Sequence, residues 1–230
     1  MTESTIGGLQ LGPLVISDAV LVTWGIMAVL VFGSLLLRWR LREQPGLVQT
    51  ALEGIVSTME EAVGHLLPEL TRQVLPFVGT LWVFLVVANL AGLVPGLSSP
   101  TDNLSVTAAL AVLVFLSVHW YGIRSAGLRA YLRHYLTPSP VLLPFHLISE
   151  LTRTVALAVR LFGNIMSLEL AALMILLVAG FLVPVPILML HIVEALVQAY
   201  IFGLLALIYI AGAVQVHEVG AQTATPPPPE

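Results

Sequence analysis

Six charged, imidazole or amide side chains interrupt the otherwise apolar stretch of residues 155–214. They are Arg160, Asn164 and Glu169 in one predicted helix, and His191, Glu194 and Gln198 in the next. An ionisable group at bilayer depth costs about 2.5–3.5 kcal/mol or more, so groups placed there usually face a pathway or a partner. Their concentration in two neighbouring helices therefore predicts a path for ions through a membrane.

Helical spacing sorts these groups onto faces. Glu150, Arg153, Arg160 and Asn164 follow one another at steps of three, seven and four residues, which places them on one stripe. Glu169 lies nine residues beyond Arg160, half a turn away on the opposite side. We therefore expect this helix to have a cationic face and a separate acidic face.

The next helix has a polar stripe of its own. His191, Glu194 and Gln198 are separated by steps of three and four residues. An antiparallel pairing of the two helices would bring Glu169 toward His191 and Gln198 toward Arg160, and we expect that pairing in the structure.

These residues provide one fixed charge and several exchangeable protons. An arginine keeps its proton in proteins, so Arg160 can attract a carboxylate and repel a passing cation but cannot relay a proton. Glu169, Glu194 and His191 can exchange protons, with pKa values set by burial and neighbours. A stripe that loads and unloads ions, beside a charge that prevents a short circuit, is what a device with two half-channels requires.

Less specific roles are open to several side chains. Arg153 can extend its charge to the membrane surface, and Glu150, three residues away, can form a local ion pair with it. Glu169 can be a buried, neutral, hydrogen-bonded acid. His119 is expected to anchor its helix at the interface. Asn89 either lines the outer path or joins two helices.

Composition identifies a membrane as the solvent of this chain. Of its 230 residues, 58% are hydrophobic and 10% are charged, and the mean hydropathy is +0.98, whereas a soluble domain has roughly 25% charged residues. The net charge of −4 argues against nucleic acid as a partner. The sequence has no cysteine, Walker loop, metal-ligand cluster or nucleophile triad. We therefore expect no enzyme activity, cofactor or metal site in the chain itself.

Hydrophobic runs predict an all-α integral membrane protein with about five transmembrane helices and one interfacial amphipathic helix. The first three spans are expected at residues 16–37, 76–94 and 104–123, and the interfacial helix at 45–71. Arginines follow the first span and the third, which places those ends in the cytoplasm. The same topology places the N-terminus outside and the C-terminus in the cytoplasm.

Two long helices are expected in the last third. No strong breaker follows Pro144 until residues 181–186, so a continuous helix over 144–182 would be about 58 Å long. That length is roughly twice the bilayer core, so this helix must tilt steeply or run partly along the interface. With a second long helix at 187–214 it is expected to form a steeply tilted antiparallel hairpin. The expected organisation is an outer segment at 1–15, one membrane domain at 16–220 and a flexible, proline-rich tail at 221–230.

Two short motifs resemble those of a known family. VRLFGN (159–164), followed by Glu169, and VQAYIF (197–202), preceded by His191, resemble the defining segments of F-type ATP synthase subunit a. Weaker similarities are NLAGLVPG (89–96) and TDNLSVT (101–107), and the resemblance extends over residues 52–210.

The resemblance implies a non-catalytic stator subunit in a bacterial inner membrane, beside a rotating ring of c subunits. It also implies contact with the b subunits of the peripheral stalk and with the rest of the complex. The family's essential arginine corresponds to Arg160, its outer half-channel groups to Glu169 and His191, its glutamine to Gln198 and its asparagine to Asn164. Each ring carboxylate would meet Arg160, release its ion into one half-channel and reload from the other.

Departures from the family pattern leave the transported ion open. Thr154, Ala156 and Ala158 stand where family members often have a proline and serines, and Glu194 is an additional acid. We expect the proton, with sodium as the alternative. Two other functions compete. One is a stand-alone secondary transporter or channel, which the absence of an internal repeat disfavours, and the other is a structural membrane scaffold.

Overall fold

The computed structural model describes residues 9–11, 14–40, 46–94, 97–129, 131, 143–179 and 184–223. Within these ranges five helices are long and apolar enough to cross a membrane. They are α1 (Asp18–Arg40), α3 (Thr71–Ala91), α4 (Leu104–Ala126), α6 (Leu143–Ala179) and α7 (Pro184–Thr223). Together with the amphipathic α2 (Leu47–Leu66), they confirm the predicted all-α membrane fold.

A short antiparallel hairpin precedes α1. Strand β1 (Leu9–Leu11) pairs with β2 (Leu14–Ile16). The sequence predicts a helix from residue 16, but β-branched Val15 and Ile16 favour a strand. α1 therefore begins at Asp18, whose negative charge suits a helix N-terminus.

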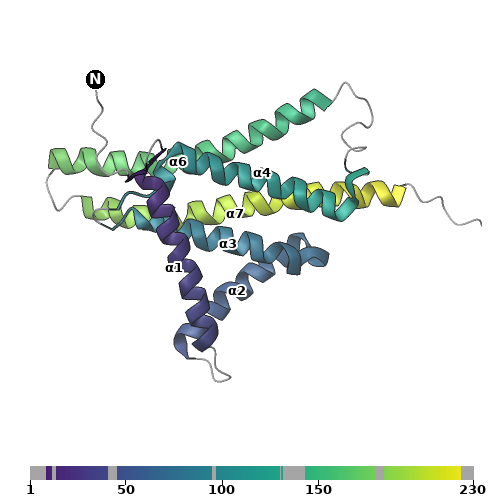
Figure 1. Ribbon diagram of the computed structural model, residues 1–230, viewed down its shortest axis with the longest axis horizontal. Coiled ribbons are helices and arrows are strands. Elements are labelled where there is room, and N and C mark those ends of the chain that lie inside the picture. The colour runs from purple at the N-terminus through teal and green to yellow at the C-terminus, as the bar shows by residue number, and fades with distance from the viewer. Residues whose placement is uncertain are drawn as a thin grey trace, which may run out of the picture.

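The first span, α1, has few neighbours in the chain. Among its described side chains only Ala19 and Ile26 are buried, and large apolar groups such as Trp24 and Phe32 are exposed. In Figure 1, α1 (purple) crosses steeply over the other long helices, and it packs against α3 and the 3-10 helix η2 (Pro100–Asp102). A helix that is apolar on all sides and yet exposed suits lipid as its solvent.

The break between α2 and α3 differs from the prediction. α2 ends at Leu66 because Pro68 cannot continue a helix interior, and Pro68 instead opens the 3-10 turn η1 (Pro68–Leu70). α3 begins directly afterwards, at Thr71, whereas the sequence predicts a start at Pro76. Pro76 lies in the second turn of α3, where it removes a single backbone hydrogen bond.

Both ends of α4 carry capping signals. Asn103 caps the start, because its Oδ1 accepts a hydrogen bond of 2.9 Å from the backbone N–H of Ser105. Gly127 follows the end with a φ of +81°, a conformation that glycine adopts without strain.

The last two helices, α6 and α7, form the predicted hairpin of long antiparallel helices (Figure 1). They contain 37 and 40 residues, about 56 and 60 Å at 1.5 Å per residue. Pro184 and Pro186 occupy the first turn of α7, where proline is tolerated. α7 extends to Thr223, into the segment expected as a tail, because the run of prolines begins only at residue 226. Residues 224–230 lie outside the described ranges.

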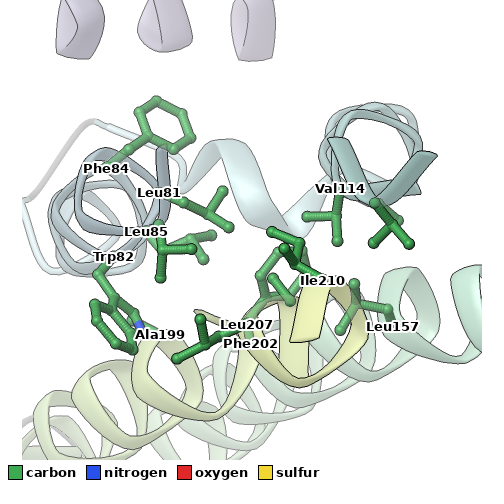
Figure 2. Close-up of a cluster of buried hydrophobic side chains, with 14 of the residues drawn as sticks. Leu81, Trp82, Phe84, Leu85, Val114, Leu157, Ala199, Phe202, Leu207 and Ile210 are labelled. Carbon is green, nitrogen blue, oxygen red and sulfur yellow. The ribbon is translucent and has the colours of Figure 1, made fainter. Parts of the chain in front are cut away.

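α7 is the centre of the bundle, because α3, α4 and α6 all pack against it. Figure 2 shows Leu85 of α3, Val114 of α4, Leu157 of α6 and Ile210 of α7 converging in one apolar core. This packing leaves the remaining faces of α6 and α7 to carry the polar residues.

Gly203 allows a close approach of α3 to α7. The indole of Trp82 occupies the space that a Cβ at position 203 would need. Trp82 Nε1 donates a hydrogen bond of 3.2 Å to the carbonyl of Tyr200, and the two rings stack with centroids 6.1 Å apart. These contacts oppose rotation of α7, so its polar stripe keeps one orientation in the bundle.

Candidate functional site

Arg160 lies in the middle of α6, on an exposed part of its surface. Leu157, three residues before Arg160, and Leu161, the next residue, are both buried against the bundle. Among the described side chains no carboxylate lies within 4.0 Å of its guanidinium. Because the guanidinium is always charged, this face of the hairpin carries a positive charge that the described part of the chain does not neutralise.

Asn164 and Gln198 join α6 to α7 one turn beyond Arg160. Asn164 Nδ2 donates a hydrogen bond of 2.6 Å to Gln198 Oε1, and Gln198 is 2% exposed. The structure therefore brings Gln198 to the turn next to Arg160, close to the predicted position.

A second contact gives the register of the hairpin. The Arg153 guanidinium lies over the ring of Tyr209, 4.6 Å from its centroid, where the ring quadrupole attracts a cation. Arg153 precedes Asn164 by eleven residues and Tyr209 follows Gln198 by eleven, so both contacts belong to one antiparallel register. Tyr209 is not among the predicted site residues, because nothing in the local sequence pattern links it to Arg153.

Two buried side chains have hydrogen-bonding atoms that are not used within the described residues. These atoms are His191 Nε2 and Gln198 Nε2, and His191 is only 3% exposed. An unsatisfied buried polar atom costs about 1–3 kcal/mol, and in native structures it calls for a specific explanation. His191 and Gln198 are therefore candidates for contact with a transported species.

The register also relates the two predicted acids to His191. Continued from the Asn164–Gln198 contact, it sets His191 level with the residue two positions beyond Glu169, less than one helical turn away. The side chain of Glu169 lies outside the described residues, so its approach to His191 stays a prediction. Glu194 is partly exposed and lies one turn from His191.

A buried hydrogen-bond network connects the segment after α3 to α7. Asn89 Nδ2 donates to the carbonyl of Ala195 over 3.1 Å, and Thr101 Oγ1 donates to Asn89 Oδ1 over 2.9 Å. Ser99 Oγ donates to the carbonyl of Ala88 over 2.9 Å and lies 2.7 Å from Thr101 Oγ1. Of the two roles open to Asn89, the structure shows the helix-joining one. Ser99 and Thr101 stabilise this arrangement of Asn89 through hydrogen bonds. Their positions in the sequence did not predict that role.

His119 and Glu150 face each other between α4 and α6. His119 Nε2 lies 3.6 Å from Glu150 Oε2, and the two side chains are 27% and 16% exposed. The ring of His119 thus lies between two helices, and its expected role as an interface anchor stays a prediction. Glu150 reaches across to α4 while Arg153 reaches across to α7, so these neighbours connect three helices.

Comparisons with known proteins give matches over most of the chain. Residues 20–211 match the family model described as ATP synthase A chain. The chain is 65% identical to ATP synthase subunit a 1 of Hahella chejuensis, over 92% of this chain and 90% of that protein. It is 62% identical to ATP synthase subunit a 2 of Pelobacter propionicus, over 94% of each. It is 57% identical to ATP synthase subunit a of Legionella pneumophila, over 93% of each.

Proposed function

Because the chain belongs to the ATP synthase A chain family, it is a multi-pass, non-catalytic membrane subunit of an F-type ATP synthase, and we propose that it translocates protons past Arg160. In this proposal a rotating ring of c subunits carries carboxylates past the arginine, and b subunits hold the chain in the stator. Two half-channels lie on opposite sides of Arg160, one open to each side of the membrane.

The observation that carries the proposal is the exposed charge of Arg160 in the middle of a membrane helix. A charge at bilayer depth is costly unless a partner or water accompanies it, and no described acid of the chain lies close enough to be that partner. A carboxylate presented by a neighbouring protein would supply it. The exposed position suits a partner that moves past, since nothing in the described bundle covers the guanidinium.

Arg160 separates the two half-channels by its permanent charge. A ring carboxylate close to the guanidinium is stabilised in its ionised form, so it releases its proton before the encounter. After it has passed, it takes up a proton from the other half-channel and becomes neutral. Because Arg160 cannot give up its own proton and repels a passing cation, protons cross only when the ring turns.

We assign His191, Glu169 and Glu194 to the outer half-channel. All three side chains can exchange protons, and the hairpin register brings the backbone at Glu169 within a turn of His191. The unused Nε2 of buried His191 supports the assignment, because this nitrogen can accept or donate a proton. Asn164 and Gln198 are positioning residues that hold α7 beside Arg160.

We propose an orientation in a bacterial inner membrane with the N-terminus outside and the C-terminus in the cytoplasm. Arg38 near the end of α1, and Arg124 and Arg129 at and after the end of α4, are exposed and favour the cytoplasmic side for both ends. The segment around η2 then lies on the outer side.

Ion pumping in vesicles that hold the purified complex tests the proposal. We expect ATP-driven acidification that does not depend on sodium and that a protonophore abolishes. Arg160→Ala should abolish pumping and coupled ATP synthesis while the subunit stays assembled, because an exposed side chain leaves no cavity when it is removed. Normal coupled synthesis by this variant would refute the role of Arg160. Sodium uptake that survives the protonophore would identify sodium as the ion.

A further inference from the structure

His119 and Glu150 are titratable groups that the mechanism above does not use. Their facing atoms, His119 Nε2 and Glu150 Oε2, lie 3.6 Å apart. Glu150 lies ten residues before Arg160 on α6, about 15 Å along the helix axis. His119 lies on α4 five residues before Arg124, so the pair is on the side of Arg160 that we assign to the cytoplasm.

The hydrogen bond of His119 to its own helix determines where its protons are. His119 Nδ1 lies 2.8 Å from the carbonyl of Phe115, and a carbonyl only accepts, so Nδ1 carries a proton. Nε2 therefore presents a lone pair when the ring is neutral and an N–H when it is charged. A neutral ring beside an ionised Glu150 would set two acceptors against each other. One proton shared by the pair, on Nε2 or on the carboxyl group, removes this repulsion.

Charged and titratable groups surround the pair on each element that packs there. On α6, Arg153 lies one turn beyond Glu150 and His146 one turn before it. From α7, Tyr209 holds the Arg153 guanidinium against its ring. After α4, the ring of Tyr131 lies 6.0 Å from that of His119. The pair is therefore surrounded by groups from α4, α6 and α7 and from the segment after α4.

A small cavity extends from Glu150 toward Arg160. Its volume is about 10 Å³, and its lining includes Glu150, Arg153, Thr154 and Tyr209, with Leu157 and apolar side chains of α4. This volume is close to the space that one water molecule needs, and the four polar side chains offer it hydrogen-bonding groups within a mostly apolar lining. The last polar residue of α6 in this lining is Thr154, six residues before Arg160, and apolar Leu157 closes the cavity three residues before the arginine.

We propose that His119 and Glu150 together bind one exchangeable proton and form a proton-binding site on the cytoplasmic side of Arg160, a role that rests on the proposed proton translocation. The pair takes the proton from cytoplasmic water, or returns it there, and the cavity continues the path along α6. Only a proton moves between Nε2, the carboxyl group and water, so no bond other than those to hydrogen changes.

The test uses the intact complex in vesicles with the cytoplasmic face outward, with interior pH fixed and exterior pH varied between about 6 and 9. ATP-driven proton uptake is compared for the unchanged chain, His119→Gln, Glu150→Gln and the double variant. The catalytic part of the complex is the same in all of them, so differences between the pH profiles come from the pair.

We expect each single variant to slow pumping roughly ten-fold or more and both to remove the same step from the pH profile. The double variant should be no slower than either single one, because one proton is shared. Glu150→Asp, which keeps an acid, should retain the step. His65 and Glu61 on α2 are a matched control: their atoms lie 3.7 Å apart, but the side chains are 77% and 74% exposed. His65→Gln and Glu61→Gln should leave the profile unchanged.

A purely structural role for the pair makes different predictions. Pumping that falls with an unchanged pH profile, effects that multiply in the double variant, or loss of assembly in both glutamine variants would each overturn the proposal. These results leave the proposed function intact as long as pumping requires Arg160. Pumping that is independent of Arg160, or driven by sodium, would instead refute the proposed function itself.

Discussion

Asn164 holds only one half of the Gln198 amide. Its Nδ2 donates to Gln198 Oε1 over 2.6 Å, while Gln198 Nε2 is buried and has no partner among the described residues. The bond therefore fixes the orientation of the amide and leaves its donor group unused. Because Asn164 lies one turn beyond Arg160, we propose that this donor contributes to the environment of the arginine in the translocation path.

Gln198→Leu should destabilise the hairpin by about 1–3 kcal/mol, because it leaves the amide of Asn164 unsatisfied. Asn164→Leu should have a similar effect. The double variant should cost less than the sum of the two, since both partners are then apolar. Thermal dissociation of the subunit from the complex measures this. Strictly additive effects would mean that the hydrogen bond contributes nothing to stability.

Gln198→Glu separates the two halves of the same amide. A carboxylate keeps an acceptor for Asn164 but has no N–H group to donate. We expect this variant to stay assembled and to pump more slowly than the unchanged chain, because it removes the unused donor beside Arg160 and adds a negative charge that competes for the arginine. An unchanged pumping rate would show that only the acceptor half of Gln198 matters.

A methyl group at position 203 should disturb the packing of α3 on α7. Gly203→Ala places a Cβ where the indole of Trp82 lies, and overpacking of this kind costs typically about 1–3 kcal/mol. Gly212→Ala is the matched control on the same helix, because nothing lies within 4 Å of the added Cβ. It should be neutral or slightly stabilising. The amount of assembled subunit in membranes and its thermal stability report both effects, and equal behaviour of the two variants would contradict the close approach.

The Arg153–Tyr209 contact should depend on the ring and not on the hydroxyl group. Tyr209→Leu should lower the stability of the hairpin by about 0.5–2 kcal/mol through loss of the cation–π attraction, whereas Tyr209→Phe should retain most of it. The measurement is again thermal dissociation, with Arg153→Gln in both backgrounds. If Arg153→Gln costs as much beside leucine as beside tyrosine, then the guanidinium gains nothing from the ring.

The helices were predictable from the sequence because a lipid solvent requires long apolar segments, and such segments appear as continuous runs of hydrophobic residues. It placed the α2–α3 break at the wrong proline, since Pro68 and Pro76 look alike until their positions in a helix are known. It also found the residues of the hairpin stripes, including Asn164 and Gln198. It could not find the partners of His119, Arg153 and Asn89, because these lie on other helices and no local pattern records which helices touch.

Glu169→Gln should slow proton pumping by several-fold and so less than Arg160→Ala, which should abolish it. The amide cannot exchange a proton, but water and the neighbouring acid Glu194 can take over part of the outer path. Glu194→Gln alone should therefore have a small effect, and the double variant should be slower than the two single effects multiplied. Proton uptake by vesicles, normalised to the amount of assembled complex, measures all three. A Glu169→Gln complex as inactive as Arg160→Ala would show that Glu194 and water do not substitute for Glu169, and that the outer half-channel has one indispensable acid.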